Sequence, residues 1–157
     1  MNYTAGQLQE AAGLSKEAFR HWKRVLPGFA RGKSRRPSFS PGDVLASIVL
    51  QCLTHGCGVR IGDLKTVAST IFDVCNETSW DVLADRTLII DLSRQACFMV
   101  PNADPMPGDG AVMVCPMEPI IGTLRDHLFR SSPVAAEKAR QHSAEISGVA
   151  SAEVQYR

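Results

Sequence analysis

The basic residues between positions 15 and 36 are the part of this chain whose types and spacing point most directly to chemistry. Lys and Arg recur at helical spacing in the first half of this stretch and crowd into six positions in the second half. Clustered guanidinium and ammonium groups bind phosphate. The residues that we expect to contact double-stranded DNA are Ser15, Lys16, Arg20, His21, Trp22, Lys23, Arg24, Arg31, Lys33, Arg35 and Arg36.

Two short helices are expected to position the first of these groups. Thr4 with Gln7 three residues later is a capping box, and Gly13 suits the end of a helix. Ser15 then caps a second helix up to Val25, with an apolar seam on one side and basic residues on the other. Such a helix-turn-helix can lay its second helix in the major groove. The alternative is a solvated surface helix with incidental charge.

The second basic group lies in residues 28–40. Four Lys and Arg residues stand between Phe29 and Phe39. This predicts a hairpin wing in which the two phenylalanines pack where the hairpin joins the fold and the tip contacts phosphate. A flexible basic linker is the alternative. Both versions favour nucleic acid as the partner.

The rest of the chain predicts a mixed α and β structure. Ser40 and Asp43 begin a strong core helix, which residues 55–58 interrupt, and a further helix should run over 61–75. Strands are expected at 86–92, 96–100 and 111–115, the first with Leu88, Ile90 and Leu92 packed at period two. Helices are expected at 81–84 and 119–129.

We therefore expect an α+β protein with three parts. Residues 1–72 form an N-terminal, mostly helical winged helix-turn-helix. Residues 78–130 form a small mixed α/β domain for dimerisation, partner binding or ligand binding. Residues 131–157 form a loose or helical tail, because their composition is rich in Ala, Ser, Gln and Glu.

Charge separates the two halves of the sequence. The net charge is +1, but residues 1–65 carry ten Lys and Arg against four Asp and Glu, whereas residues 66–157 carry seven against twelve. A basic half attracts phosphate and an acidic half does not. Each half is therefore expected to have a different partner, with the acidic half as the candidate homodimer interface.

Several other functions find little support in the sequence. No apolar run is long enough for a membrane span and no signal peptide is visible, so we expect a cytoplasmic protein. The five cysteines do not form a disulfide framework, and Cys52, His55 and Cys57 lack a fourth ligand for zinc. Gly108-Asp109-Gly110 has no phosphate-binding lysine. We expect no metal, no cofactor and no enzymatic activity.

Four motifs in the first half resemble the DNA-binding domain of the MerR family. Tyr3–Leu8 resembles its opening Tyr-x-Ile-Gly-Glu-Leu, and Ala12–Ser15 with Phe19–Trp22 resembles Gly-Val-Ser followed by Leu-Arg-Tyr-Tyr. Phe39-Ser40 with Asp43-Val44 resembles the Tyr-Ser-x-x-Asp-Val that closes the wing. Gly56–Leu64 resembles the Leu-Gly-Phe-Ser-Leu-x-Glu-Ile of a second helix pair. The match keeps its order over about residues 3–70.

The resemblance implies that Arg20 and His21 approach the DNA backbone or base edges, and that Arg35 and Arg36 act from the wing. The sequence departs from the family at Ala5, at Pro37 and in lacking the long dimerising coiled coil. The effector chemistry of the family therefore does not carry over. A transcriptional regulator is the first expectation. An adaptor for phage or plasmid DNA assembly is the alternative, since excisionases, terminase small subunits and partition proteins carry related modules.

Overall fold

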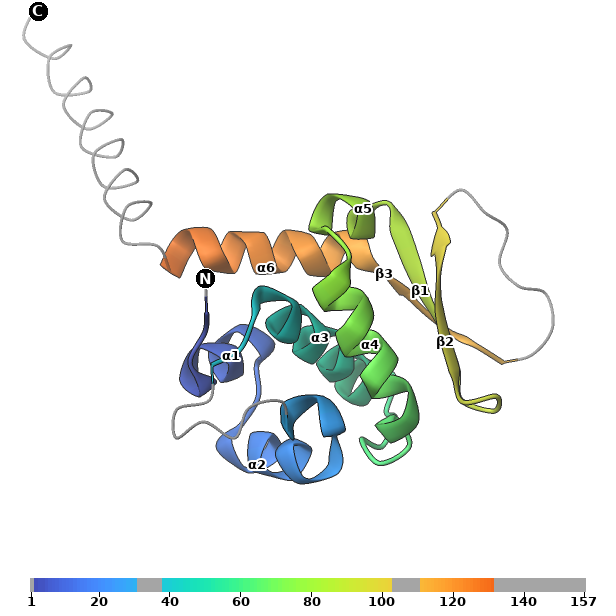
Figure 1. Cartoon of the computed structure of the whole chain (residues 1–157), viewed down its shortest axis with the longest axis horizontal. Coiled ribbons are helices and arrows are strands. Elements are labelled where there is room, and N and C mark those ends of the chain that lie inside the picture. Colours follow the sequence, from blue (N-terminus) through green and yellow to red (C-terminus); the bar gives the residue numbers. More distant parts are fainter. Residues whose placement is uncertain (1, 31–37, 103–110, 132–157) are drawn as a thin grey trace, which may run out of the picture. The chain divides into compact units, whose positions relative to one another are not determined.

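The computed structural model describes residues 2–30, 38–102 and 111–131 of the 157-residue chain (Figure 1). The chain divides into two compact units, Met1–Gly122 and Thr123–Arg157. Its helices and three-stranded antiparallel sheet confirm the α+β class. The expected boundary between residues 72 and 78 lies inside the first unit, and the division into domains stays a prediction.

The first two helices begin and end where local signals predict. In α1 (Ala5–Ala12), the Thr4 hydroxyl and the Gln7 side chain form the expected capping box. Gly13 ends α1 in the left-handed conformation, with φ of 63°. In α2 (Lys16–Val25), the Ser15 hydroxyl accepts a hydrogen bond from the backbone N–H of Ala18 at 3.1 Å. These side chains satisfy backbone groups that a helix end leaves free.

Two longer helices form the centre of the Met1–Gly122 unit. α3 (Pro41–Gln51) is buried along most of its length and continues as a π-helical turn, Cys52–Gly56, before Gly58 adopts a φ of 69°. α4 (Lys65–Glu77) lies beside α3 (Figure 1). The expected start at residue 61 was wrong by one turn. Residues 61–65 form turns with backbone hydrogen bonds between residues three apart, such as that from the Leu64 N–H to the Ile61 carbonyl.

The sheet follows a short helix, α5 (Trp80–Ala84). Strand β1 (Arg86–Asp91) is central and pairs antiparallel with both β2 (Ala96–Pro101) and β3 (Met113–Pro116). The strand order is β2-β1-β3. The three expected strands and the expected pairing of the first two are therefore confirmed.

The expected period-two packing of β1 was wrong. Leu88, Ile89 and Ile90 are all buried, whereas Leu92 lies half-buried in the turn that follows. A central strand can be covered on both faces and then shows a continuous apolar run. The sequence alone could not show that β1 would be the middle strand.

Cysteine thiols mark the contact between α4 and one face of the sheet. Burial raises the pKa of the Cys75 thiol on α4 to about 12, with smaller contributions from Cys97 and Cys115. Burial likewise raises the pKa of Cys97 to about 11 and that of Cys115 to about 12. Cys75 and Cys115 are buried and Cys97 is half-buried, where α4 contacts β2.

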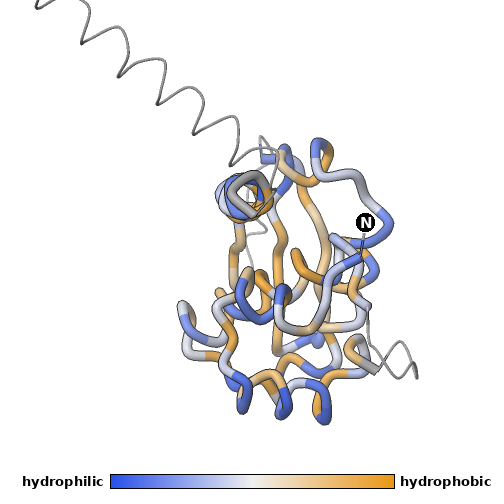
Figure 2. The backbone as a smooth tube through the Cα atoms, turned by 90° about the vertical axis from the view of Figure 1, so that its left-hand side faces the viewer, coloured by the Kyte–Doolittle hydropathy of each residue, from blue (hydrophilic) through white to orange (hydrophobic). Residues whose placement is uncertain are grey.

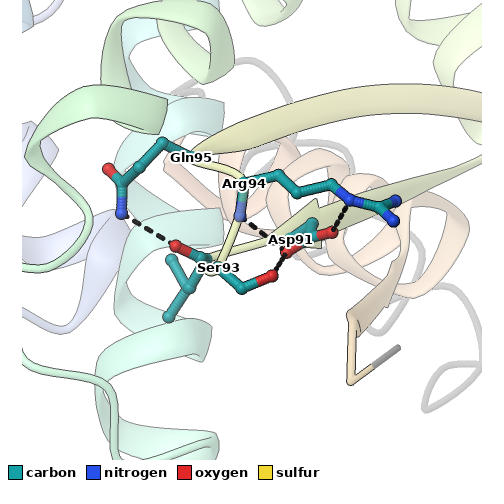
Figure 3. A network of polar contacts seen from close by, with 5 residues as sticks. Asp91, Ser93, Arg94 and Gln95 are labelled. Atoms are coloured by element: carbon teal, nitrogen blue, oxygen red, sulfur yellow. Dashed lines mark hydrogen bonds and ion pairs between the residues drawn. The ribbon is translucent and has the colours of Figure 1, made fainter. Parts of the chain in front are cut away.

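The turn between β1 and β2 is organised by one buried carboxylate (Figure 3). Asp91 accepts hydrogen bonds from the Ser93 hydroxyl at 2.5 Å and the Arg94 backbone N–H at 3.0 Å. These two bonds lower the pKa of Asp91, and Arg94 contributes further through an ion pair. Gln95 adopts a φ of 52°, so the strained residue of the turn sits beside this network.

The last described helix, α6 (Met117–Ser131), is longer than the 119–129 expected and passes from the first unit into the second. Met117, Ile120 and Ile121, on its part of the first unit, are buried. No described helix is both long enough and apolar enough to cross a membrane. The expected tail, 131–157, falls almost wholly outside the described residues.

Candidate nucleic-acid interface

The outer face of α2 carries most of the expected contact residues. Along its ten residues the outward side chains are charged or polar, and Figure 2 shows hydrophilic turns at the lower edge, where α2 lies in Figure 1. The inward side is formed by Phe19 and Trp22. The exposed members of the expected set on α2 and its cap are Ser15, Lys16, Arg20, His21, Lys23 and Arg24.

Trp22 belongs to the core and not to this outer face. It is 4% exposed, and its ring centroid lies 6.2 Å from that of Phe29. We had expected Trp22 among the contact residues, and a side chain this deeply buried supports the helix from below. The spacing of Phe19 and Trp22 already placed both on the apolar seam of the helix, and the structure confirms that both lie on its buried side.

An aromatic cluster fixes the orientation of α2. Phe29 lies at its centre, with ring centroids 5.6 Å from Phe19, 6.1 Å from Phe39 and 5.2 Å from Phe72. Most of these pairs meet edge to face, the arrangement that aromatic quadrupoles favour. The cluster ties α2 to the chain on both sides of the second basic group and to α4.

Close packing at this cluster also explains Gly28. The turn Pro27–Ala30 is a 3₁₀ helix, and a Cβ at Gly28 would lie 2.3 Å from the Phe72 ring. A side chain there would push the ring out of place. The sequence suggested only that Pro27 and Gly28 end α2.

The cations of α2 border an open depression of about 480 Å³, which Arg20, Lys23 and Arg24 line. The Lys23 ammonium lies 5.9 Å from the centroid of the Phe19 ring, within the range of a cation–π contact. Within the described ranges no carboxylate pairs with Lys16, Arg20, Lys23 or Arg24. Their charge is therefore available to an anionic partner.

The described residues on both sides of the second basic group are held in the fold. The expected contact residues Arg31, Lys33, Arg35 and Arg36 lie outside the described residues. Phe39, directly after them, is held by two backbone bonds to Tyr3, of 2.7 and 2.9 Å. The Phe29 and Phe39 rings, with centroids 6.1 Å apart, therefore hold the described residues on both sides of this group close together.

A polar network that the sequence did not reveal joins the start of α3 to the end of α4. The Ser40 hydroxyl caps α3 and also donates to Asn76 Oδ1 at the end of α4. The Asn76 amide donates in turn to Asp43 Oδ1 at 3.0 Å and to the Phe72 carbonyl at 2.8 Å. The capping box was predictable because Ser40 and Asp43 are three residues apart. The contact with Asn76 was not, because Asn76 lies 33 positions after Asp43.

The cysteine and histidine group after α3 lies on an exposed turn. Cys52, His55 and Cys57 are exposed on the π-helical turn. No group of three His, Cys, Asp or Glu side chains in the described part of the chain could hold a metal ion. Burial, together with Cys57, raises the pKa of the Cys52 thiol.

Neither a scan against protein-family models nor a search of the curated proteins finds a match for this chain.

Proposed function

We propose that this chain is a sequence-specific double-stranded DNA-binding protein and a transcriptional regulator, with α2 lying in the major groove. One observation carries the proposal. Lys16, Arg20, Lys23 and Arg24 are exposed on one helix, and no carboxylate in the described ranges neutralises them. The major groove is about 12 Å wide and admits one α-helix.

The arrangement around α2 supports a winged helix-turn-helix of the MerR kind. α1 and α2 are joined by a short turn at Gly13, which is the connection that a helix-turn-helix uses. The loop between Phe29 and Phe39 is the proposed wing, and its four cations would contact the neighbouring backbone or minor groove. The bridge between Tyr3 and Phe39 anchors that wing to the start of α1.

Affinity and specificity come from different groups in this proposal. Phosphate contacts by Lys16, Lys23 and Arg24 would provide most of the affinity, because counterion release dominates binding to duplex DNA. Arg20 and His21, on the exposed face of α2, are placed to read base edges.

The test is fluorescence anisotropy with a duplex from the region upstream of its own gene, a random duplex and a single strand, over a series of salt concentrations. We expect Arg20→Ala to weaken specific binding by about 1–3 kcal/mol, roughly five- to 150-fold. Arg20→Lys keeps the charge but loses the planar two-donor fork, so it should lose discrimination between the duplexes more than affinity. Glu17→Gln, an exposed neighbour on α2, is the matched control and should bind at least as tightly.

The wing has its own measurement. Removing two phosphate contacts with Arg35→Ala/Arg36→Ala should reduce the slope of log K against log salt by about 1.8, at about 0.9 for each contact. Absence of binding to any duplex at low salt would contradict the proposal. The basic surface would then have to be a docking site for an acidic protein.

A further inference from the structure

Strand β2 is an edge strand in which Pro101, at its end, is the one residue that blocks pairing. Its only strand neighbour among the described residues is β1. Its sequence, Ala-Cys-Phe-Met-Val-Pro, contains no charged residue, and every one of its six residues is at least partly exposed. Edge strands of monomeric proteins are normally blocked by lysines, inward charges or bulges, because their free backbone groups recruit another strand.

The register of the sheet shows which backbone groups of β2 are free. The Asn102 N–H donates to the Asp85 carbonyl at 3.1 Å and extends the ladder that pairs Arg86 with Pro101. Hydrogen-bonded and non-hydrogen-bonded pairs alternate in an antiparallel ladder. The backbone groups of Cys97 and Met99 therefore point away from β1, toward the open side of the strand.

We infer that β2 pairs antiparallel with β2 of a second copy of this chain, with the two-fold axis passing beside Phe98. Symmetry allows few registers, because the pairing must be the same from either copy. With Cys97 opposite Met99 of the second copy, the outward N–H and C=O groups of both residues are all paired. One neighbouring symmetric register places Pro101, which has no N–H, opposite Cys97 and loses bonds. The other places Met99 opposite Gln95, whose φ of 52° is not that of an extended strand.

The same register joins the two exposed aromatic rings. Phe98 is 43% exposed, and it would face Phe98 of the second copy at a non-hydrogen-bonded position. The Cα atoms at such positions are about 4.5 Å apart, so the side chains are in contact. Aromatic cross-strand pairs stabilise a sheet. The backbone bonding pattern and the exposure of Phe98 thus select the same pairing independently.

The self-matching hydrogen-bond register of β2 favours a second copy over an unrelated strand. The register brings Arg94, whose side chain is 72% exposed, beside Asn102 of the second copy. Arg94 is ion-paired with Asp91 of its own chain, so it adds no unpaired charge at this point. Because β2 itself carries no charged side chain, pairing two copies of it brings no like charges together.

The inference depends on the sheet and not on DNA binding. If the proposed function also holds, the dimer would carry two copies of α2 and would suit an operator with two related half-sites. The failure of one claim leaves the other intact, because the sheet experiments below contain no DNA.

The first experiment is sedimentation velocity of the full chain over a wide range of concentration. Val114 on β3 is the matched control, because Phe98 and Val114 flank Ile89 in one row of the sheet and are similarly exposed, at 43% and 44%. We expect the wild type and Val114→Lys to sediment as dimers and Phe98→Lys to be monomeric, since like charges directly opposite each other are destabilising. Far-UV circular dichroism checks that both variants are folded.

The second experiment tests the register by disulfide cross-linking. In a Cys52→Ser/Cys57→Ser background, Phe98→Cys should form a covalent dimer upon mild oxidation by copper phenanthroline, because about 4.5 Å between Cα atoms suits a disulfide. Val114→Cys should not. A wild type that is monomeric at every concentration, a dimeric Phe98→Lys, a monomeric Val114→Lys, or cross-linking of both cysteine variants or of neither would overturn the inference.

Discussion

Two exposed surfaces of the Met1–Gly122 unit, the outer face of α2 and the open edge of β2, offer a partner different chemistry. α2 presents cations above a buried aromatic cluster, and its backbone bonds are satisfied within the helix. β2 presents free backbone groups and apolar side chains without a single charge. The cationic face of α2 suits an anionic partner. The edge of β2 suits another strand, which would supply the missing backbone hydrogen bonds.

Phenylalanine has a different role in each of these two regions. Phe29 is 5% exposed and is surrounded by four other rings, whereas Phe98 is 43% exposed on an edge. The first contributes to the stability of the fold, and the second is available for association. The following predictions test this difference, in order of decreasing effect.

The largest effect is expected from Phe29→Ala. Removing the central ring should lower the free energy of unfolding by about 3–5 kcal/mol, because a buried cavity replaces four aromatic contacts. Phe98→Ala, measured at a concentration low enough to keep the chain monomeric, should change it by only about 0.5 kcal/mol. Urea titration followed by circular dichroism gives both values. Equal losses would remove the distinction between the two regions.

Gly28→Ala should overfill the same cluster. The new methyl group would meet the Phe72 ring at 2.3 Å, so we expect a loss of about 1–3 kcal/mol. Gly56→Ala is the control, because a Cβ there meets nothing within 4 Å. Thermal unfolding of the two variants side by side is sufficient, and an unchanged melting temperature for Gly28→Ala would show that the cluster is loosely packed.

A smaller effect is expected from the caps. Ser40→Ala removes both the cap of α3 and the bond to Asn76, and should cost about 1–2 kcal/mol. Ser15→Ala removes the cap of α2 alone and should cost about 0.5–1 kcal/mol. Chemical denaturation compares them. If Ser15→Ala proved the more costly change, the link between α3 and α4 would have no energetic role.

The smallest effect concerns the pH dependence of the β1–β2 turn. Because the folded-state pKa of Asp91 lies below the ordinary 3.8, the ionised carboxylate stabilises the folded state above that pH, and this contribution is lost as the pH falls through the folded pKa. The stability advantage of the wild type over Asp91→Asn should therefore be present at neutral pH and disappear in acid. An advantage that persists or grows in acid would show that the carboxylate charge is not what orders the turn.

Much of the chain could be predicted because its signals are local. Thr4 with Gln7, Gly13, Ser15, and Ser40 with Asp43 each satisfy or redirect backbone groups no more than a few residues away, and the helices begin and end accordingly. The strands β1, β2 and β3 also lie where their β-branched and apolar runs predict. The charge of α2 was likewise readable from helical spacing.

The sequence by itself thus determined the order of helices and strands, their caps and the basic character of α2, because those depend on neighbours in the chain. Only the tertiary structure decided that β1 is covered on both faces and that Asn76 joins α3 to α4. It also decided that β2 lies at an edge. Burial and strand order depend on which distant elements pack together, and no local pattern encodes that choice.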